Sequence, residues 1–375
     1  MNGQDTAQMI EFKLPSLGAD MDEGKLLEWK VKPSDRVRRG DVIAVVDTSK
    51  AAVDVEIWSD GTVQELVVRP GETIPVGTVM ATLLEPGAEA AAPAAEPVVP
   101  PPGRRLISPA ARRRADELGV ALDLVTGTGP HGTVILQDVE RAAAAQAAPP
   151  DRQAEMRKAI AAAMGRSKRE IPHYYLSETI PLAQAAAWLQ TENAQRPVAE
   201  RLLMAVLFLK ATALACVKFP DMNGYYRDGR FVPQPAVHVG VAISLRQGGL
   251  IAPALHDVAT KSLTRLMAEL ADLVARARAG SLRSSEMSDP TITVTNLGEG
   301  GVESVLGVIY PPQVALVGFG RVQDRPWVED GQIVVQPAVT ASLAADHRVS
   351  DGHRGARFLA EIGNLLQQPG HLQGE

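Results

Sequence analysis

The chain has 375 residues, which is long for one domain, so two or three domains are expected. Its net charge of −6 at pH 7 removes any bulk electrostatic case for binding nucleic acid or an anionic membrane. A single cysteine excludes an internal disulfide framework, and no apolar stretch is long enough to span a bilayer, so we expect a soluble, cytoplasmic protein.

Residues 9–85 predict an all-β unit with a lysine at the tip of a hairpin. Apolar residues alternate on both sides of a polar turn, which predicts two strands that present Lys50 to solvent. The segment before this hairpin recurs 37 residues later; the matched positions include Gly24, Pro33, Gly40 and Ala44 with Gly61, Pro70, Gly77 and Ala81. Two similar half-units of short strands predict a flattened barrel or sandwich with a pseudo-two-fold axis.

Two linkers separate the domains. Residues 86–103 contain six prolines, six alanines and no aromatic residue, so this segment cannot bury a core of its own. Proline-rich chain extends by ~3.1 Å per residue, which gives a semi-rigid tether with a reach of roughly 50 Å. A shorter linker is expected over 143–151.

Residues 104–142, between the linkers, predict a small pair of helices. Ser108 is placed to cap a helix that begins with Pro109 and stops at Gly119, and a second helix is expected to open at Asp138. The loop 127–132 matches the dinucleotide fingerprint G-x-G-x-x-G. That motif requires a preceding strand within a βαβ unit of about thirty residues, so nucleotide binding is rejected.

Residues 152–375 predict one large α/β unit, which is enough chain for a sizeable core. Helices are expected at 198–219, 263–279 and 355–367. Strands are expected at 237–244, 250–255, 291–296, 314–318 and 334–344.

The most informative polar residues follow the last expected strand. His347 and Asp351 are four residues apart, at a strand-to-helix junction of the kind that often carries catalytic groups. Other interpretations stay open from spacing alone. His347 can be an ordinary hydrogen-bonded histidine, and Asp351 can cap the final helix. A metal site that includes His353 is a third interpretation, although it follows no standard zinc pattern.

Residues 15–24 and Asp47-Thr48-Ser49-Lys50-Ala51 resemble a lipoyl domain, whose family carries lipoic acid on the hairpin lysine through an amide bond. The commoner family turn has an acid in place of Ser49. A biotin carrier is the nearest alternative, but its lysine usually lies between two methionines, and here Ser49 and Ala51 flank it. The resemblance implies a lipoyl barrel-sandwich over 9–85 with lipoic acid on Lys50.

Residues 106–113, 127–132 and 138–139 resemble a peripheral subunit-binding domain, a small α-helical module. His131 stands where that family usually has glycine. In the family, the basic first helix grips an acidic patch on a partner enzyme. The resemblance therefore implies that Arg112, Arg113 and Arg114 bind a partner.

The motif Asp-His-Arg-Val-x-Asp-Gly at 346–352 is similar to the active-site motif of the dihydrolipoamide acyltransferases of 2-oxo acid dehydrogenase complexes. Further family marks lie at 156–161, 171–174, 249–253, 261–263, 293–298 and 311–313. The resemblance implies an α/β core like chloramphenicol acetyltransferase over 152–375, assembled as trimers. Its implied partners are a thiamine-diphosphate-dependent 2-oxo acid decarboxylase and dihydrolipoamide dehydrogenase.

The resemblance also assigns roles, and these suit the residue types. Acyl transfer between thiols needs a base, because the thiolate is the nucleophile and a free thiol has a pKa of ~8.5. His347 is the implied base, since neutral imidazole accepts a proton near pH 7. Thr295 is the implied hydroxyl donor to the developing oxyanion, and Asp351 is expected to orient the site through a salt bridge. Coenzyme A is the implied acceptor, and no metal is expected.

Three questions stay open at this point. A non-catalytic scaffold with the same three modules is the alternative function, but such relatives lose the histidine that this chain keeps. The acyl group is expected to be acetyl, with branched-chain and acetoin-derived acetyl versions as alternatives. Family chains usually end in an apolar tail that joins trimers into a shell. Here Leu372 is the only large aliphatic residue in 367–375, so a weak or absent shell is expected.

Overall fold

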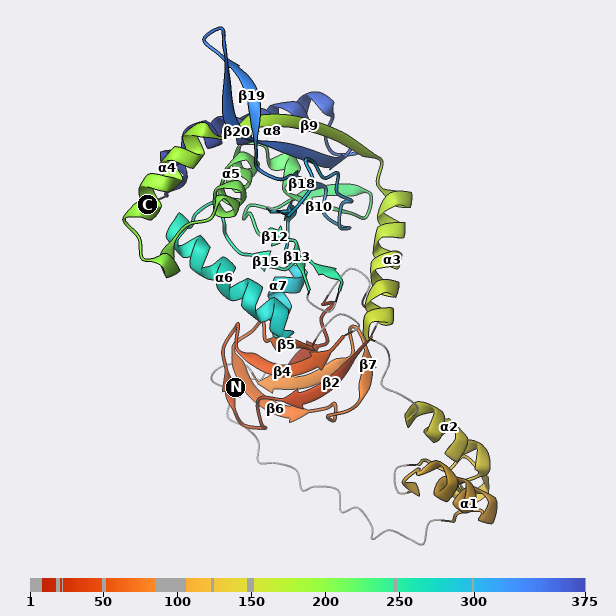
Figure 1. The fold of residues 1–375 in the computed structure, drawn as a ribbon. Helices are drawn as coiled ribbons and strands as arrows, with labels where there is room; N and C mark the ends of the chain where they lie inside the picture. Colours follow the sequence, from red (N-terminus) through yellow and green to blue (C-terminus); the bar gives the residue numbers. More distant parts are fainter. Residues whose placement is uncertain are drawn as a thin grey trace, which may run out of the picture. The chain divides into compact units, whose positions relative to one another are not determined.

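Figure 1 shows the fold in a computed structural model, which describes residues 9–17, 21, 23–48, 52–84, 106–122, 125–146, 152–245, 248–298 and 300–374. Lys50, with Ser49 and Ala51, lies outside the described residues, as does the first expected linker, 86–103. The helices between 106 and 146 belong to a separate compact unit. Of the helices described, none combines the length and the apolar character that crossing a membrane requires.

The N-terminal part is the predicted all-β unit. Its strands are β1 (Met9–Lys13), β2 (Glu23–Trp29), β3 (Arg36–Val37), β4 (Val42–Asp47), β5 (Ala52–Glu56), β6 (Gly61–Leu66), β7 (Thr73–Pro75) and β8 (Val79–Leu84). One sheet has the order β1–β8–β6–β3, and β5, β4, β2 and β7 lie in that order in the other. The strands β2, β3 and β4 repeat as β6, β7 and β8. The sequence repeat is therefore a structural repeat, as predicted.

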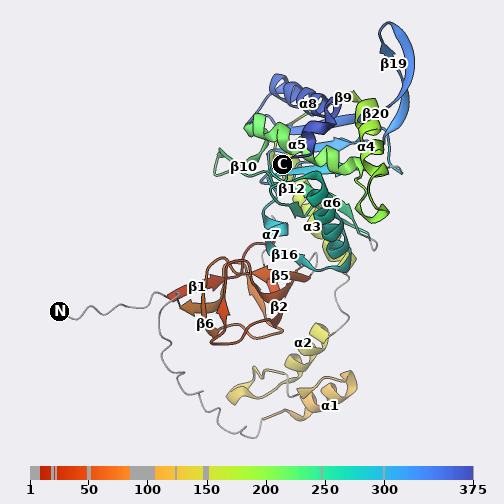
Figure 2. The ribbon, with the colours of Figure 1, turned by 90° about the vertical axis from the view of Figure 1, so that its left-hand side faces the viewer.

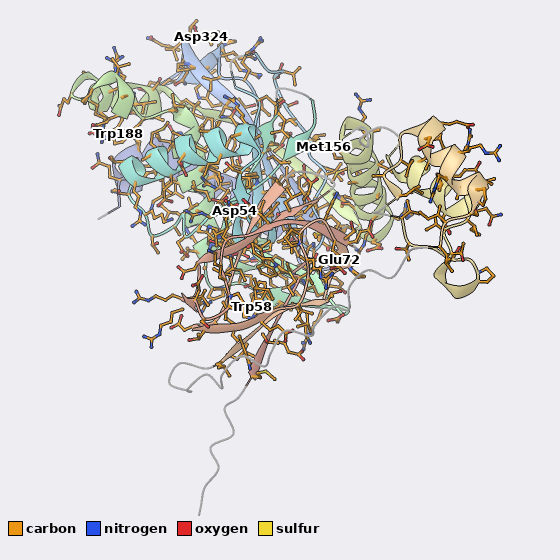
Figure 3. The ribbon with its side chains drawn as sticks, turned by 90° about the horizontal axis from the view of Figure 1, so that it is seen from below. Asp54, Trp58, Glu72, Met156, Trp188 and Asp324 are labelled. Atoms are coloured by element: carbon orange, nitrogen blue, oxygen red, sulfur yellow. The ribbon has the colours of Figure 1, made fainter. Side chains whose placement is uncertain are left out.

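Side chains alternate between the two faces of these strands, and one face is buried. In β5 and in the first half of β2, buried residues occur at every second position. Phe12, Leu26 and Met80 are fully buried between the sheets. The ring of Trp58, labelled in Figure 3, covers Phe12 with 4.3 Å between ring centroids. The predicted hairpin is formed by β4 and β5, in which Asp47 pairs with Ala52.

The small unit contains α1 (Pro109–Leu118) and α2 (Leu136–Gln146). Ser108 Oγ caps α1 by accepting the Ala111 N–H at 3.1 Å, and Gly119 ends the helix with a left-handed φ of 66°. Both features were predicted. The helix α2 begins two residues before Asp138 and continues to Gln146, into the segment expected as linker. Its run of alanines explains the extension, because alanine has the highest helix propensity.

Asp138 anchors the glycine-rich loop of this unit instead of opening the helix. Its buried carboxylate accepts the Thr128 N–H at 2.9 Å, the Thr128 hydroxyl at 2.6 Å and the Ile135 N–H at 3.0 Å. A Cβ on Gly127 would lie 2.3 Å from the Gly132 carbonyl oxygen. The glycine spacing is therefore explained by close backbone packing, and α1, not a strand, precedes the loop.

The C-terminal part is a mixed α/β unit built on a seven-stranded sheet with the order β15–β12–β17–β18–β20–β19, and β9 pairs with β20. Its longer helices are α3 (Arg152–Glu170), α4 (Ala183–Ala194), α5 (Met204–Lys218), α6 (Leu263–Ala279) and α8 (Gly352–Gln367), with the short α7 (Ser284–Ser288). The strands of this sheet are β9 (His173–Pro181), β12 (Val239–Val241), β15 (Ala254–Leu255), β17 (Ile292–Asn296), β18 (Ala315–Phe319), β19 (Gln323–Glu329) and β20 (Gln332–Asp346). The remaining short strands are β10 (Gly224–Arg227), β11 (Arg230–Pro233), β13 (Ile243–Ser244), β14 (Leu250–Ile251) and β16 (Leu282–Arg283).

The core of this unit lies between the sheet and its helices. The helix α5 is buried on nearly every side, as its apolar sequence predicted, and it packs beside α8 (Figure 1). Phe208 of α5 stacks on Phe319 of β18 with 4.3 Å between ring centroids. Leu372, in a short 3-10 turn (Pro369–Leu372), is fully buried in the same core. It is therefore not available as the tail anchor considered from the sequence.

Some predicted boundaries were wrong for a physical reason. The helix expected from residue 198 begins only at Met204, because Asn193 holds the preceding chain outside the helix. Its side chain accepts the Leu202 N–H at 2.8 Å and donates to the Leu202 carbonyl at 2.9 Å. The strands β9 and β19 were missed. Figure 2 shows that β19 and the adjoining part of β20 extend away from the rest of this unit as a long hairpin.

Candidate active site

His347 lies on a tight turn directly after β20. The carbonyl of Asp346 accepts the backbone N–H groups of Val349 and Ser350 at 3.0 and 3.1 Å, which folds the turn around it. The Asp346 carboxylate is fully buried and accepts Nε and Nη2 of Arg348 at 2.9 and 2.7 Å. This bond also raises the pKa of Arg348. The turn that carries His347 is therefore fixed by an ion pair between the buried Asp346 carboxylate and the partly exposed Arg348 guanidinium.

The His347 side chain is exposed in a single chain. One backbone contact and one ring contact hold the residue. Its backbone N–H donates to the Pro172 carbonyl at 3.0 Å. Its ring meets the Tyr174 ring nearly at right angles, with 5.3 Å between centroids. The Tyr174 hydroxyl is 2.8 Å from Ser350 Oγ, on the far side of the same turn.

Asp351 caps α8, as one of the sequence interpretations held. Its carboxylate accepts the Arg354 N–H at 2.8 Å. In a single chain the Asp351 carboxylate faces the first turn of α8 and joins no ion pair among the described residues, so the expected salt bridge stays a prediction. The ion pairs nearby are Asp346 with Arg348, and Arg354 with Asp221 at 2.9 Å. An open depression of about 530 Å³ adjoins Ser350 and Asp351.

Thr295 is half-buried near the end of β17, and a single chain does not bring it to His347. Thr295 pairs with Gly318, and Gly318 pairs with Ser342, so Thr295 lies two strands away from β20. From Ser342 to His347 is five residues along β20, or roughly 17 Å at the rise of a strand. Two strand spacings of ~4.8 Å add to this, so the separation is on the order of 19 Å.

The remaining candidates lie in the N-terminal modules. Lys50 itself lies outside the described residues, between the paired Asp47 and Ala52 of the β4–β5 hairpin. Arg112 and Arg113 are exposed on α1. Arg114 is half-buried and forms ion pairs with Glu117 at 2.8 Å and Glu140 at 3.6 Å, so it helps join α1 to α2. In the part of the chain that the structure describes, no group of three or more suitable side chains is placed to hold a metal ion.

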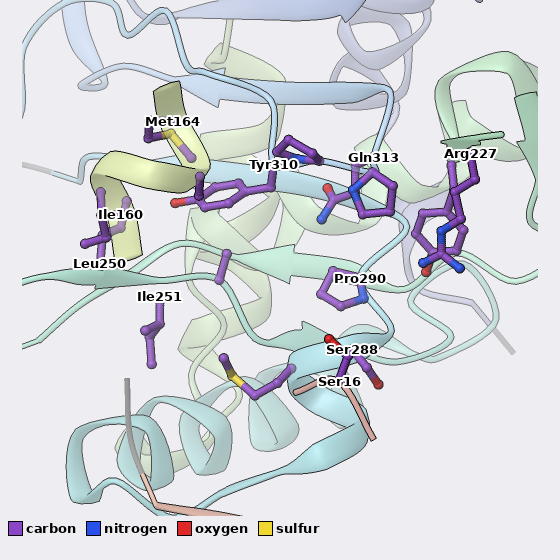
Figure 4. Close-up of a pocket in the computed structure, with 16 residues that line it drawn as sticks. Ser16, Ile160, Met164, Arg227, Leu250, Ile251, Ser288, Pro290, Tyr310 and Gln313 are labelled. Carbon is purple, nitrogen blue, oxygen red and sulfur yellow. The ribbon is translucent and has the colours of Figure 1, made fainter. Parts of the chain in front are cut away.

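Sequence reasoning gave no role to residues 171–174, although it noted them as a family mark. They reach the site because β9 pairs with β20, where His173 is opposite Asp346 and Tyr174 is opposite Ala345. His173 Nε2 also accepts the Ile309 N–H at 3.2 Å. Ile309 precedes the loop whose Tyr310 and Gln313 line a cavity beside Ile160 and Met164 of α3 (Figure 4).

Comparison with protein-family models gives three matches in chain order. Residues 10–83 match the biotin and lipoyl model described as "Biotin-requiring enzyme", and residues 105–140 match the e3 binding domain. Residues 151–373 match the catalytic domain of the 2-oxoacid dehydrogenase acyltransferases. The chain belongs to this acyltransferase family. It is thus an acyltransferase with a lipoyl domain and a small subunit-binding domain, and the predicted fold class is confirmed.

Relatives of this acyltransferase match it over nearly their full length. The dihydrolipoyllysine-residue acetyltransferase component of the pyruvate dehydrogenase complex of Rhizobium meliloti is 32% identical, covering 96% of this chain and 98% of that protein. The corresponding component of the acetoin cleaving system of Bacillus subtilis is 30% identical, covering 97% and 99%.

Solved structures resemble the catalytic part. One of the dihydrolipoamide acetyltransferase of Azotobacter vinelandii covers 58% of this chain and 90% of that one, with 29% identity and a TM-score of 0.54. A probable dihydrolipoamide acetyltransferase of Listeria monocytogenes gives 28% identity over 56% of this chain and 91% of that one, also with a TM-score of 0.54.

Proposed function

We propose that this acyltransferase passes an acetyl group from a lipoyl group on Lys50 to coenzyme A, in the cytoplasm, within a 2-oxo acid or acetoin dehydrogenase complex. The observation that carries the site is the turn of residues 346–351, which carries His347 and is fixed by the ion pair of Asp346 with Arg348. The names of the Rhizobium and Bacillus relatives support acetyl as the acyl group. Their names also favour lipoyl-lysine over biotin.

The spacing of the candidate residues supports their roles. The solved Azotobacter structure comes from an investigation of the role of a serine, a histidine and an asparagine in the catalytic mechanism. The serine lies 52 positions before the histidine, and the asparagine lies four positions after it. Thr295, His347 and Asp351 have the same two spacings. Threonine supplies the same hydroxyl as serine, and aspartate resembles asparagine in size and as a helix cap.

The lipoyl group, when bound, supplies the thiol that carries the acyl group. Lys50 lies outside the described residues, but the strands that flank it in sequence pair with each other, Asp47 with Ala52, and this supports an attachment site between them. We propose that His347 takes the proton of the attacking coenzyme A thiol and returns it to the lipoyl sulfur that departs, since neutral imidazole is a base near pH 7. The Thr295 hydroxyl donates a hydrogen bond to the acyl oxygen as negative charge develops there.

The distance between Thr295 and His347 supports a site completed between subunits. A base and an oxyanion donor must both lie within about 3 Å of the reacting group, and in one chain they are on the order of 19 Å apart. We infer that Thr295 of one chain joins His347 of another, in a closed ring of three. The solved cubic core of a pyruvate dehydrogenase multienzyme complex, 29% identical to this chain, supports an assembled core.

The small helical unit is proposed to bind dihydrolipoamide dehydrogenase or the decarboxylase. Its match to the e3 binding domain supports this role. The exposed Arg112 and Arg113 offer two positive charges on one helix, and guanidinium groups bind carboxylates in a bidentate geometry. Arg114 supports the helix pair through Glu117 and Glu140.

The direct test is transfer from acetyl-CoA to dihydrolipoamide by the full chain. We expect His347→Ala to lower kcat by at least ~10²-fold, the usual scale for the loss of a general base. Thr295→Ala should cost a comparable ~10²-fold through the lost oxyanion donor. His371→Ala, at an exposed histidine outside the site, is the matched control. Unchanged rates in both site variants would leave only a scaffold function. In a separate assay, isobutyryl-CoA in place of acetyl-CoA tests the preference for the acyl group.

A further inference from the structure

Tyr174 contacts both sides of the turn that carries His347. Its ring meets the His347 ring edge to face, and its hydroxyl reaches Ser350 Oγ, three residues beyond His347. The preceding carbonyl of Pro172 accepts the His347 N–H. We propose that Tyr174 is a positioning residue that holds the imidazole of His347 in the orientation needed for proton transfer. This inference rests on the proposed role of His347 as the base.

Packing against β20, the core and α8 keeps Tyr174 in place. Tyr174 is paired with Ala345 of β20, directly before the turn, and it is packed against the main core. The helix α8 leaves room for its hydroxyl at Gly355, where a Cβ would lie 2.8 Å from the Tyr174 oxygen. Gly355 is buried, so the tyrosine side chain is packed closely between its own strand and α8.

His173 fixes the strand on the other side of Tyr174. Its Nδ1 is 2.9 Å from the Ile171 carbonyl oxygen, and its Nε2 accepts the Ile309 N–H. These two bonds require a neutral ring with the hydrogen on Nδ1. The start of β9 is thus tied to the loop before β18, and Tyr174 has little freedom to move along the strand.

The hydroxyl of Tyr174 acts through position and not through proton exchange. Burial raises the pKa of Tyr174, so the hydroxyl stays neutral at the pH of the reaction. A neutral phenol can share a hydrogen bond with Ser350 throughout the cycle. Its ring restricts rotation of the imidazole, since edge-to-face aromatic pairs have a preferred geometry. Small displacements of a catalytic group reduce the rate strongly.

The test compares Tyr174→Leu, Tyr174→Phe and Ser350→Ala in the full chain. We expect Tyr174→Leu to lower kcat by up to ~10²-fold, the scale for a displacement of about 1 Å, with the KM for dihydrolipoamide nearly unchanged. Tyr174→Phe keeps the ring and should lower kcat by about fivefold, the rate equivalent of one hydrogen bond. Adding Ser350→Ala to Tyr174→Phe should have no further effect, because both remove the same bond.

Tyr175→Phe is the matched control, since Tyr175 is the next residue, is exposed and points away from the turn toward Lys168. The orientation of His347 is read independently from the NMR signal of its ring, identified by its loss in His347→Ala. We expect this signal to move in Tyr174→Leu and not in Tyr175→Phe.

The outcomes separate the two proposals. Loss of activity in His347→Ala, together with a kcat in Tyr174→Leu within twofold of the wild type, overturns the positioning role and leaves the base in place. A raised KM with an unchanged kcat also overturns it. Full activity in His347→Ala removes the proposed base itself. If Tyr174→Leu fails to fold, the Tyr174→Phe and Ser350→Ala pair decides, and additive losses would contradict the shared bond.

Discussion

Asp346 and Asp351 stand on either side of His347, and their surroundings differ. Asp346 is fully buried and holds Arg348, whose guanidinium also lies 3.9 Å from the centre of the Tyr226 ring. Asp351 is exposed and caps α8. The motif identified His347 and both carboxylates from sequence, but it could not say which carboxylate forms the ion pair. That choice depends on burial, which the spacing of residues within the motif does not encode.

Tyr174 illustrates a further limit at the residue scale. It lies 173 positions before His347 in the sequence, and no local pattern joins the two. Their contact follows from the pairing of β9 with β20, a long-range feature of the sheet. The sequence marked residues 171–174 as typical of the family without indicating what they touch.

Lys50 is the residue proposed to carry the lipoyl group. We expect Lys50→Arg to abolish lipoylation and turnover of the whole complex, because arginine keeps the charge and offers no acylatable amine at neutral pH. Transfer to free dihydrolipoamide by the same variant should continue. Intact-protein mass spectrometry gives the measurement. A lipoyl mass increment that persists on the variant would show that another residue carries the group.

His173 should make the stability of the catalytic part depend on pH. Burial lowers its pKa, and Lys168 and Arg348 act in the same direction. The hydrogen bond to the Ile171 carbonyl and the charge of Asp346 oppose them. The folded state therefore favours the neutral ring, so its contribution to stability is present above the unfolded pKa of ~6.5 and is lost as pH falls below it. We expect the urea concentration at the unfolding midpoint to decrease as the pH is lowered from 7.5 to 5.5. The decrease should be smaller in His173→Asn. An equal slope in both proteins, with His371→Asn as control, would contradict this assignment.

At the scale of elements, strong amphipathic patterns were the most predictable. The helix α6 has the predicted bounds, Leu263–Ala279, since Ser262 caps it and Gly280 ends it with a left-handed φ of 74°. The strand β9 was missed because its burial does not alternate regularly. The start of α5 was misplaced because the Asn193 side chain, a tertiary contact, binds the Leu202 backbone.

The helix α1 carries the charge that is proposed to bind a partner enzyme. Replacing the exposed Arg112 and Arg113 with glutamate should release dihydrolipoamide dehydrogenase or the decarboxylase, because like charges then face each other. Arg114 is left unchanged because its ion pairs with Glu117 and Glu140 join α1 to α2. Association with the unaltered chain should also slow as salt rises. Surface plasmon resonance at several salt concentrations measures both effects. Arg201→Glu and Arg230→Glu, at exposed positions outside α1, are the control. Binding that is insensitive to salt would argue against this mode.

At the scale of the whole molecule, the three modules each serve a different part of the proposed function. The lipoyl domain bears the acyl group, the small helical unit recruits a partner, and the catalytic part transfers the group. The sequence predicted the order of the modules along the chain and the fold of each module. It could not predict that Thr295 and His347 lie on the order of 19 Å apart in one chain, because that distance depends on sheet register.

Complementation between chains tests this account most directly. Thr295→Ala and His347→Ala are each expected to be nearly inactive alone, since each lacks one half of every site. In trimers formed from an equal mixture of the two chains, random assembly leaves about one quarter of the interfaces with both residues intact. We therefore predict that co-expressed, mixed trimers recover roughly 25% of the wild-type kcat per chain. Mixed trimers no more active than the separate variants would contradict a site shared between subunits.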